Sequence, residues 1–466
     1  MFNSLKQLIG LFAISLGAMI GPLDTSVNVA FPHIVDDLDQ PMEMIRWVVI
    51  CYVLTYASLM LVFGKLGDLY GRRRIFSIGL AVNVGSLYLI SISSSFDSLL
   101  FCRFLQGVGT GLTTSVAPAL MIALYPESKR SYAVGLFTVV FAVGGLLGPI
   151  LGGFLVEAFD WRAVFWFRIP ISAVSLILIF ALPKPNHEKR GGTFDGLGAV
   201  TLICSISLCL LTINQFHSLD TNGIWPIIGL GAAASVLIFW FIRHEKAAKE
   251  PIVNLDVFQN IEFVILNIAS CFLYLTTFSV ILIIPFFLYR TEGLSANDAG
   301  LILSVGFVGT SIAGLLGGRI IGTINPRLVS FFGVLITGLG LTSISGVQGP
   351  DDIPWMIASL VLQGAGTGLF QASYMYSITG MLPITQRGVS GSITMLTRTI
   401  GVVSGVTVLT LAFVWLNQNG GTAALDEDTQ FQKSFQAIFV LAGGGLLVFL
   451  LATMAWPRVW FGRSPN

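Results

Sequence analysis

One acidic residue, Asp24, lies inside a long apolar stretch near the start of the chain. No other charge occurs between Leu8 and Phe31, and a carboxylate at the centre of a membrane helix costs about 2.5 to 3.5 kcal/mol on the insertion scale. A carboxyl group at such a position can take up and release protons, so we expect Asp24 to carry protons. Pairing with Asn28 or with an arginine of the same bundle is the structural alternative.

Two arginines, Arg103 and Arg398, lie deep in later apolar stretches. A guanidinium group stays charged, so such an arginine pairs with a carboxylate, binds a substrate or holds helices together through backbone carbonyl groups. We expect Arg103 to act with Asp24 and Arg398 to line a substrate cavity, with the packing role as the alternative for both. No HExxH motif or Cys/His metal spacing and no P-loop occurs, so we expect no metal and no cofactor.

Apolar stretches of this kind make up most of the chain. The sequence has 466 residues, of which 54% are hydrophobic and 11% are charged, whereas soluble domains carry roughly 25% charged residues. About fourteen stretches are long enough to cross ~30 Å of hydrocarbon as helices. The connections are too short to fold as a soluble domain, so we predict an all-α integral membrane protein that is not an enzyme and whose helices carry the function.

Basic residues gather in alternate loops. Lys65, Arg74 and Lys189 follow even-numbered stretches, whereas the opposite loops carry acidic clusters such as those at Asp37 and Asp351. The positive-inside rule therefore predicts an even number of spans with both termini in the cytoplasm. We expect a multi-pass protein of the cell membrane, which is the inner membrane where there are two. The formal net charge of +1 gives no reason to expect a nucleic-acid partner.

The chain contains an internal repeat. Residues 105–112 (LQGVGTGL) and 362–369 (LQGAGTGL) differ at one position, and the same spacing aligns Arg130 with Arg387. This pattern predicts two halves of the same orientation, related by an axis along the membrane normal. Two such bundles around a midplane site are typical of alternating-access carriers.

The repeat also divides the chain into segments. We predict an N-terminal six-helix bundle at residues 1–183 and a C-terminal six-helix bundle at residues 259–466. Residues 184–258, which the repeat leaves out, hold two inserted transmembrane helices with charged linkers.

The turn after the second apolar stretch, residues 64–74, reads GKLGDLYGRRR. It resembles the loop signature of the major facilitator superfamily, Gly-x-Leu-x-Asp-x-x-Gly-Arg-Lys/Arg. Glycines allow a tight turn, and Asp68 can face the N-terminus of a helix across the boundary between the halves. A basic turn that anchors the chain at the membrane surface is the alternative. The resemblance implies a conformational gate formed by Gly64, Asp68, Gly71, Arg72 and Arg73.

A glycine pattern in the fifth stretch is similar to the antiporter motif of exporters in this superfamily. It consists of Gly135, Gly144, Gly148, Pro149, Gly152 and Gly153. Small residues at a spacing of four let helices approach closely, and Pro149 kinks its helix, although generic glycine packing is the alternative. The second half keeps Gly401 and Gly405 but lacks the proline. The pattern therefore predicts a specialised role for the fifth span of the first half.

Residues 23–32 (LDTSVNVAFP) resemble the signature of the fourteen-span drug:proton antiporter family, and residues 161–170 resemble its sixth span, with Arg168 where Asn is more common. The resemblance covers nearly the whole chain. It implies the major facilitator fold with two six-helix bundles plus two inserted helices, and proton coupling through Asp24 and Arg103. We expect the substrate cavity to be lined by Asn28, Tyr52, Gln106, Phe137, Phe141, Tyr274, Phe278, Gln371, Tyr374 and Arg398.

These features together predict proton-coupled export of amphipathic small molecules such as drugs, dyes or biocides by alternating access. One alternative is a dedicated exporter or flippase for a single lipid or metabolite, and another is a sensor or channel without coupling. The expected partners are the substrate, protons and the lipid bilayer, and the need for a periplasmic adaptor is left open. Because deep acidic residues are scarce, we expect divalent organic cations to be poor substrates.

Overall fold

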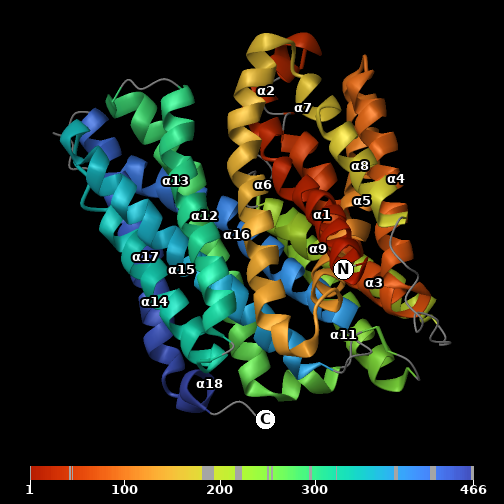
Figure 1. Cartoon of the computed structure of the whole chain (residues 1–466). Coiled ribbons are helices and arrows are strands. Elements are labelled where there is room, and N and C mark those ends of the chain that lie inside the picture. The colour runs from red at the N-terminus through yellow and green to blue at the C-terminus, as the bar shows by residue number, and fades with distance from the viewer. Residues whose placement is uncertain are drawn as a thin grey trace.

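A computed structural model of the chain describes residues 2–40, 44, 46–180, 194–215, 223–248, 251–252, 255–292, 296–321, 323–382, 387–419 and 427–462. Over these ranges the regular elements are helices (Figure 1). Thirteen candidate membrane spans meet the demands of length and apolar composition. The glycines, threonines and Arg103 of α5 (Phe96–Ala123) make that 28-residue helix less apolar, and it completes the set of fourteen expected crossings.

The first half of the chain forms one bundle. Its helices are α1 (Phe2–Leu23), α2 (Ser26–Asp37), α3 (Arg46–Tyr70), α4 (Arg72–Ser91), α5, η2 (Glu127–Lys129), α6 (Arg130–Ala158), α7 (Ala163–Trp166) and α8 (Arg168–Phe180). Two spans are interrupted, because α1 continues into α2 across residues 24–25 and α7 continues into α8 across residue 167. Within the bundle α5 packs between α3 and α4, and α1 packs against α6 and α8.

The last part of the chain forms a second bundle with the same pattern of packing. Its helices are η4 (Leu255–Gln259), α12 (Ile261–Glu292), α13 (Ala296–Ile320), α14 (Pro326–Ile344), η5 (Pro350–Asp352), α15 (Ile353–Met381), α16 (Arg387–Asn419), α17 (Glu427–Thr453) and α18 (Pro457–Phe461). Here α15 packs between α13 and α14, and α12 packs against α16. The repeated segments 105–112 and 362–369 lie at corresponding places in α5 and α15.

Two further helices, α9 (Gly196–Gln215) and α11 (Trp225–Ala247), lie outside both bundles in the chain order and pack against each other. Helix α9 also contacts α3 and α16, so it touches both bundles. A contact of 2.9 Å between Nε2 of His244 and Oδ2 of Asp195 joins α11 to the segment before α9. The charged linker expected at 184–190 lies outside the described residues. This packing supports the division into two bundles and an inserted pair, which we keep as a proposal.

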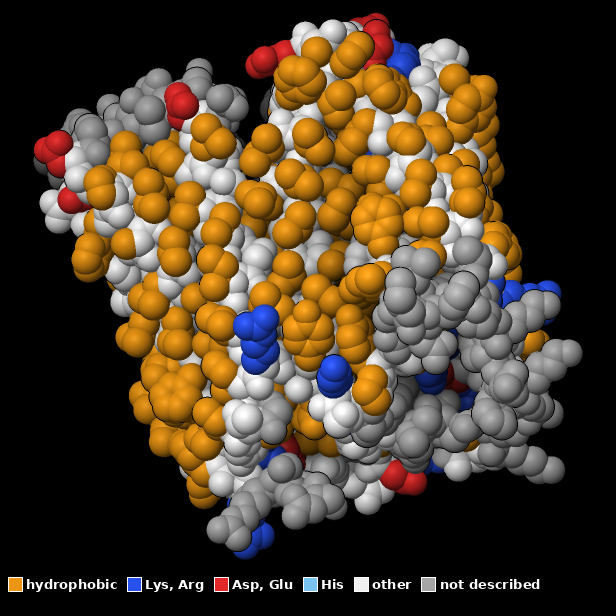
Figure 2. Space-filling view, in the orientation of Figure 1, with side chains coloured by type: hydrophobic (Ala, Val, Ile, Leu, Met, Phe, Trp, Pro, Cys, Tyr) orange, Lys and Arg blue, Asp and Glu red, His pale blue; other side chains and the backbone are white. Residues whose placement is uncertain are grey.

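The two ends of the molecule differ in charge. We call the end where α3 turns into α4 at Gly71 the basic end, and the end where α4 turns into α5 the acidic end. On the face in Figure 2, Lys and Arg gather in the lower half and most Asp and Glu lie at the top. Figure 2 also shows a notch between the two bundles at the acidic end. At the basic end the bundles touch through α6 with α13 and through α16 with α3 and α5.

Candidate functional site

Asp24 lies at the break between α1 and α2. The chain follows helical turns through the break, with the Thr25 hydroxyl donating to the Pro22 carbonyl over 2.9 Å. Pro22 lies within the last turn of α1, and a proline removes a helix hydrogen bond and bends the chain. The break places the Asp24 carboxylate inside the bundle, where the residue is 8% exposed.

Two arginines hold the Asp24 carboxylate. Arg103 of α5 donates from Nη1 to Oδ1 over 2.8 Å and from Nη2 to Oδ2 over 2.9 Å. Arg168 donates from Nη1 to Oδ1 over 2.6 Å, and Gln106 adds a hydrogen bond of 3.0 Å to the same oxygen. Charge-assisted hydrogen bonds contribute about 1.5 to 3 kcal/mol each. The network therefore stabilises the ionised carboxylate, and Asp24 must move away from at least one arginine before it can bind a proton.

The remaining contacts of the two arginines fix them in place. Nε of Arg103 donates to the Val48 carbonyl over 2.9 Å, and Nε of Arg168 donates to the Val164 carbonyl over 2.9 Å. The Phe165 ring lies beside both guanidinium groups, 5.8 Å from that of Arg103 and 5.2 Å from that of Arg168. Arg168 is fully buried, and its Nη2 has no hydrogen-bond partner in the structure.

Aromatic residues of α3 connect this network to the boundary between the bundles. The Arg103 guanidinium lies 4.4 Å from the ring centre of Tyr52, and the Tyr52 and Tyr56 rings meet edge to face with centres 5.1 Å apart. The Tyr56 hydroxyl interacts with Thr399 and with the charge of Arg398, both on α16. A continuous path of polar and aromatic groups therefore runs from Asp24 to the other bundle.

The second bundle has a polar centre without carboxylates. The Tyr374 hydroxyl donates to Oδ1 of Asn267 over 2.9 Å and lies 2.8 Å from the Thr397 hydroxyl. Asn267 donates in turn to the Phe263 carbonyl over 2.7 Å, and Thr397 lies 3.2 Å from the Ser270 hydroxyl. These bonds join α12, α15 and α16 through neutral groups.

Arg398 lies between the two bundles. Its guanidinium carbon is 4.1 Å from the ring centre of Phe141 on α6 and 5.0 Å from that of Tyr274 on α12. Phe141 in turn packs on Phe137, with ring centres 5.9 Å apart. Arg398, Phe141, Phe137 and Tyr274 thus form one group from both halves of the chain.

The other residues expected to line the cavity do not belong to the group around Arg398. Tyr52 and Gln106 belong to the Asp24 network. Gln371 is buried on α15, and its Nε2 has no partner in the structure, while Phe278 packs against Gly405 of α16. Asn28 is exposed, so the partners of Asp24 are the arginines and Gln106 rather than this amide.

Contacts that cross the boundary at the basic end involve the proposed gate. Gly71 has φ of 100°, a left-handed conformation that favours glycine. Asp68 binds Nε of Arg72 over 2.9 Å through Oδ1. Its Oδ2 accepts a hydrogen bond of 3.3 Å from the backbone amide of Val389, in the first turn of α16. A carboxylate is favourable at a helix N-terminus, so Asp68 stabilises the closed basic end.

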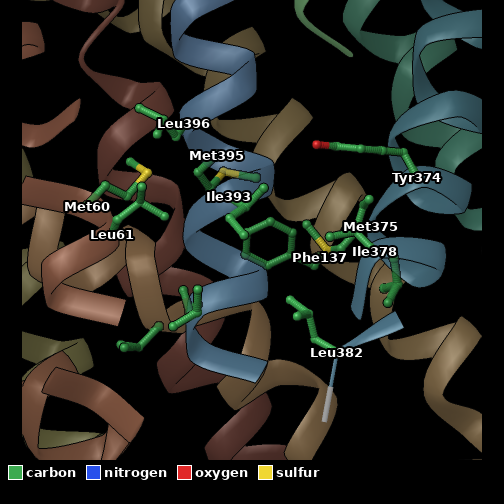
Figure 3. Packing of buried hydrophobic residues seen from close by; sticks show 14 of the residues in the cluster. Met60, Leu61, Phe137, Tyr374, Met375, Ile378, Leu382, Ile393, Met395 and Leu396 are labelled. Atoms are coloured by element: carbon green, nitrogen blue, oxygen red, sulfur yellow. The ribbon is translucent and has the colours of Figure 1, made fainter. Parts of the chain in front are cut away.

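Four further features lie at this end. Arg73 donates to the Phe180 carbonyl over 2.9 Å within the first bundle. Across the boundary Arg130 donates to the Tyr376 carbonyl over 2.9 Å, and Gly64 is buried in α3. Figure 3 shows apolar side chains of α3, α6, α15 and α16 that point toward one another, including Met60, Phe137, Met375, Ile378, Ile393 and Leu396. They form an apolar contact between the bundles.

The glycines of α6 serve two different interfaces. A Cβ atom at Gly135 would lie 2.9 Å from the Cα atom of Gly318 in α13, so this glycine allows contact between the bundles. Gly144 and Gly152 face α1 and α2 of the same bundle, where an added Cβ would meet Met19 and Ser26 at 2.7 Å. Gly148 faces Thr25 and Ser26, beside Asp24. The motif thus packs α6 against the segment that holds the acidic residue.

Two further residues of the motif, Gly153 and Pro149, and Gly405 of the second half can be compared with these glycines. Gly153 has only Val29 near it, at 4.0 Å, and Pro149 lies within α6 without ending the helix. In the second half, an added Cβ at Gly405 would lie 2.6 Å from the Leu275 carbonyl oxygen. Gly405 is therefore packed as tightly against α12 as the glycines of α6 are against α1.

Arg168 belongs to the site although its sequence position did not predict this role. Arg168 lies near the start of α8, and Pro170 two residues later cannot donate a backbone hydrogen bond. The chain is interrupted just before, at residue 167. The signal was present in the sequence, since Arg168 is a third arginine inside an apolar stretch.

The fold and the site define a helical membrane transporter, made of two pseudo-equivalent bundles with buried charge near their boundary. The family model described as Major Facilitator Superfamily matches residues 8–246 and 266–464. The chain belongs to this superfamily, and it is a multi-pass membrane transporter of small molecules rather than an enzyme.

The chain is similar to several proteins that are named as transporters or drug resistance proteins. Multidrug resistance protein 3 of Bacillus subtilis is 30% identical over 91% of this chain and 85% of its own length. The riboflavin transporter RibZ of Clostridioides difficile is 28% identical over 86% of this chain and 87% of its own length. The crystal structure of the human organic anion transporter MFSD10 (TETRAN) covers 96% of this chain and 99% of that chain, with a TM-score of 0.68 at 15% identity. The last likeness shows the fold alone.

Proposed function

We propose that the protein exports amphipathic small molecules such as drugs, dyes or biocides in exchange for protons. The observation that carries the proposal is the Asp24 carboxylate, buried inside the first bundle and held by Arg103 and Arg168. A single buried carboxylate with two fixed cations is ionised in this arrangement and can bind a proton when the helices rearrange. The relatives named as multidrug transporters support export of such substrates.

The closed basic end and the notch at the acidic end support alternating access. In this arrangement the gate residue Asp68 binds both Arg72 and the Val389 amide of the other bundle, and Arg130, outside the expected gate, binds the Tyr376 carbonyl across the boundary. We propose that the basic end faces the cytoplasm, together with both termini, and that the structure corresponds to an outward-facing state. Opening the basic end requires these bonds to break. A rearrangement that separates Asp24 from Arg103 or Arg168 lets the carboxylate bind a proton, and this proton binding supplies a part of the free energy for the conformational change.

One proton that enters down ~150 mV of proton-motive force yields about 3.5 kcal/mol, which supports a concentration ratio of a few hundred. No nucleotide is then needed. The dedicated lipid or metabolite exporter stays a second candidate, because RibZ is named for a single vitamin.

A transport assay tests the proposal. The full-length protein is reconstituted in proteoliposomes, a pH gradient is imposed, and the movement of a panel of unrelated fluorescent dyes is followed. We expect several dyes to move against their gradient and a protonophore to stop them. Movement of one compound only would favour the dedicated exporter. Dye movement that never exceeds equilibration would show that protons are not coupled.

A further inference from the structure

Arg398 occupies a special place in the repeat. The repeat aligns Arg130 at the start of α6 with Arg387 at the start of α16, and the same spacing aligns Phe141 with Arg398. The structure brings these two equivalent residues into contact, with the guanidinium carbon 4.1 Å from the ring centre. Residues related by a two-fold pseudo-axis meet only near that axis. Arg398 therefore lies close to the axis between the two bundles, along which parallel-repeat carriers hold their substrates.

Within the part of the chain that the structure describes, no carboxylate binds the guanidinium group of Arg398. No hydrogen bond or ion pair of Arg398 occurs among the described residues, and its Nη1 is buried without a partner. The hydroxyl of Tyr274, whose ring lies 5.0 Å away, is also buried without a partner. By contrast, Arg103 and Arg168 both bind Asp24. Buried donors are nearly always satisfied, so these two groups are suited to an acceptor that the protein itself does not supply.

Most of the charges that lie deep inside the described helices are positive. Among the described residues, the charges that lie within the spans and away from their ends are Arg103, Arg168 and Arg398 against the single carboxylate of Asp24. Arg103 and Arg168 share this carboxylate within the first bundle, so the positive charge of Arg398 near the axis is not neutralised by it. In a low-dielectric environment an anion is attracted to such a charge and a cation is repelled.

We propose that Arg398 binds the acidic group of the substrate and that the preferred substrates are aromatic monoanions. The inference rests on the proposed export function and specifies its substrate. A guanidinium group binds a carboxylate or sulfonate through two parallel hydrogen bonds, and the Tyr274 hydroxyl supplies a further donor. The ring of Phe141, which lies beside the Arg398 guanidinium, provides an apolar surface for the aromatic part. Neutral analogues bind more weakly, and cations bind most weakly.

Binding of three matched probes to the full-length protein in nanodiscs tests this. Dansylglycine, dansylglycine amide and dansylaminoethyl-trimethylammonium share one fluorescent ring system and carry a negative, no and a positive charge. We expect the wild-type protein to bind the acid about tenfold or more tightly than the amide and the cation least. Arg398→Gln should remove the advantage of the acid, and Arg398→Lys should keep part of it because the charge remains.

Arg319→Gln is the matched control, since this exposed arginine at the end of α13 also removes one positive charge. It should leave all three affinities within about twofold, because exposed distant charges are screened by salt. If Arg398→Gln proves unstable in a thermal melt, Tyr274→Phe replaces it and should weaken the acid selectively by a smaller factor. The proposal is refuted if the wild type binds the cation as tightly as the acid, or if Arg398→Gln weakens acid and amide equally. Selective binding without pH-driven transport would instead refute the export function alone.

Discussion

Equivalent positions of the repeat carry different chemistry in the two bundles. In α5, Arg103 and Gln106 bind Asp24. The repeat places Leu360 and Gln363 at the same positions of α15, where Leu360 is fully buried and Gln363 bonds to Thr367 over 3.0 Å. The first bundle therefore has an ionic centre, whereas the second has hydroxyl and amide groups around Tyr374.

This difference suggests a division of labour. Proton binding changes the charge of a carboxylate and so alters the free energy of the ionic network by several kcal/mol. A network of hydroxyl and amide groups does not change its charge near neutral pH, so its bonds can rearrange without a proton. We infer that the first bundle couples transport to protons and that the second bundle contributes recognition. The experiments below test this comparison.

The largest effect should come from Asp24→Asn. The amide has a similar shape but cannot release a proton, so export driven by a pH gradient should be abolished. Counterflow, in which labelled and unlabelled substrate exchange without net proton movement, should persist. Both rates are measured in proteoliposomes.

The same substitution also leaves Arg103 and Arg168 without their counter-ion, which costs about 3 to 5 kcal/mol when a buried pair is broken. A thermal melt and matched protein levels must therefore accompany the assay. Asp36→Asn is the control, since Asp36 is exposed near the end of α2. Gradient-driven export at the wild-type rate in the Asp24 variant would show that protons enter elsewhere.

Much of this comparison follows from the sequence, and part of it does not. Asp24, Arg103 and Arg398 stand out because charges inside apolar stretches are rare, and the repeat aligns the helices. Asp24 and Arg168 are far apart in the chain, and only the packing of α8 against α1 brings them together. Asn28 shows that residues close in the sequence can lie in different surroundings. It follows Asp24 by four residues, but its side chain is exposed whereas Asp24 is buried. Helical spacing alone does not determine which face of the short α2 is buried.

A second strong effect concerns the glycines. The sequence pattern alone predicts that Gly148→Leu removes export, that Pro149→Ala impairs it less and that Gly405→Leu is milder than Gly148→Leu. The structure leads us to revise the last expectation, because a side chain at Gly405 would also meet backbone. We expect both leucine variants to remove export. A leucine side chain would push α6 away from the start of α2, or α16 away from α12, and either separation disturbs its bundle.

Gly153→Ala is the matched control, because an added methyl group there has only Val29 nearby, at 4.0 Å. It should retain export and wild-type membrane levels. Full export by Gly405→Leu beside an inactive Gly148→Leu would restore the specialised role of the motif and sharpen the difference between the bundles.

A smaller effect is expected for Tyr374→Phe. The change removes the hydrogen bonds to Asn267 and Thr397 and leaves Oδ1 of the buried Asn267 without this donor, which costs about 1 to 3 kcal/mol, while Thr397 keeps its contacts with Ser270 and the Thr394 carbonyl. We expect a lower Tm and a raised KM, with the dependence of export on the pH gradient unchanged. A variant that binds substrate normally but has lost its proton coupling would contradict the division between the bundles.

The smallest effect concerns Asp37, at the acidic end of the first bundle. Its Oδ2 accepts hydrogen bonds of 3.0 Å from Trp161 and 2.9 Å from Arg162. The bond from Trp161, followed by that from Arg162, holds the pKa of Asp37 below its ordinary value of 3.8. A group with a lowered pKa in the folded state contributes stability above the unfolded value, and this contribution is lost as the pH falls through the folded value.

Asp37→Asn should therefore lower the Tm by about 1 to 3 °C at pH 7, as expected for an exposed ion pair. The difference from wild type should persist down to about pH 5 and disappear below pH 3.8, where the wild-type carboxyl also becomes protonated. Thermal melts of the detergent-solubilised protein across this range measure it, with Asp36→Asn as the neighbouring reference. A Tm difference that stays constant down to pH 3 would mean that the contribution of Asp37 to stability does not depend on its charge. Export should be unaffected at pH 7, because Asp37 lies outside the ionic centre that distinguishes the first bundle from the second.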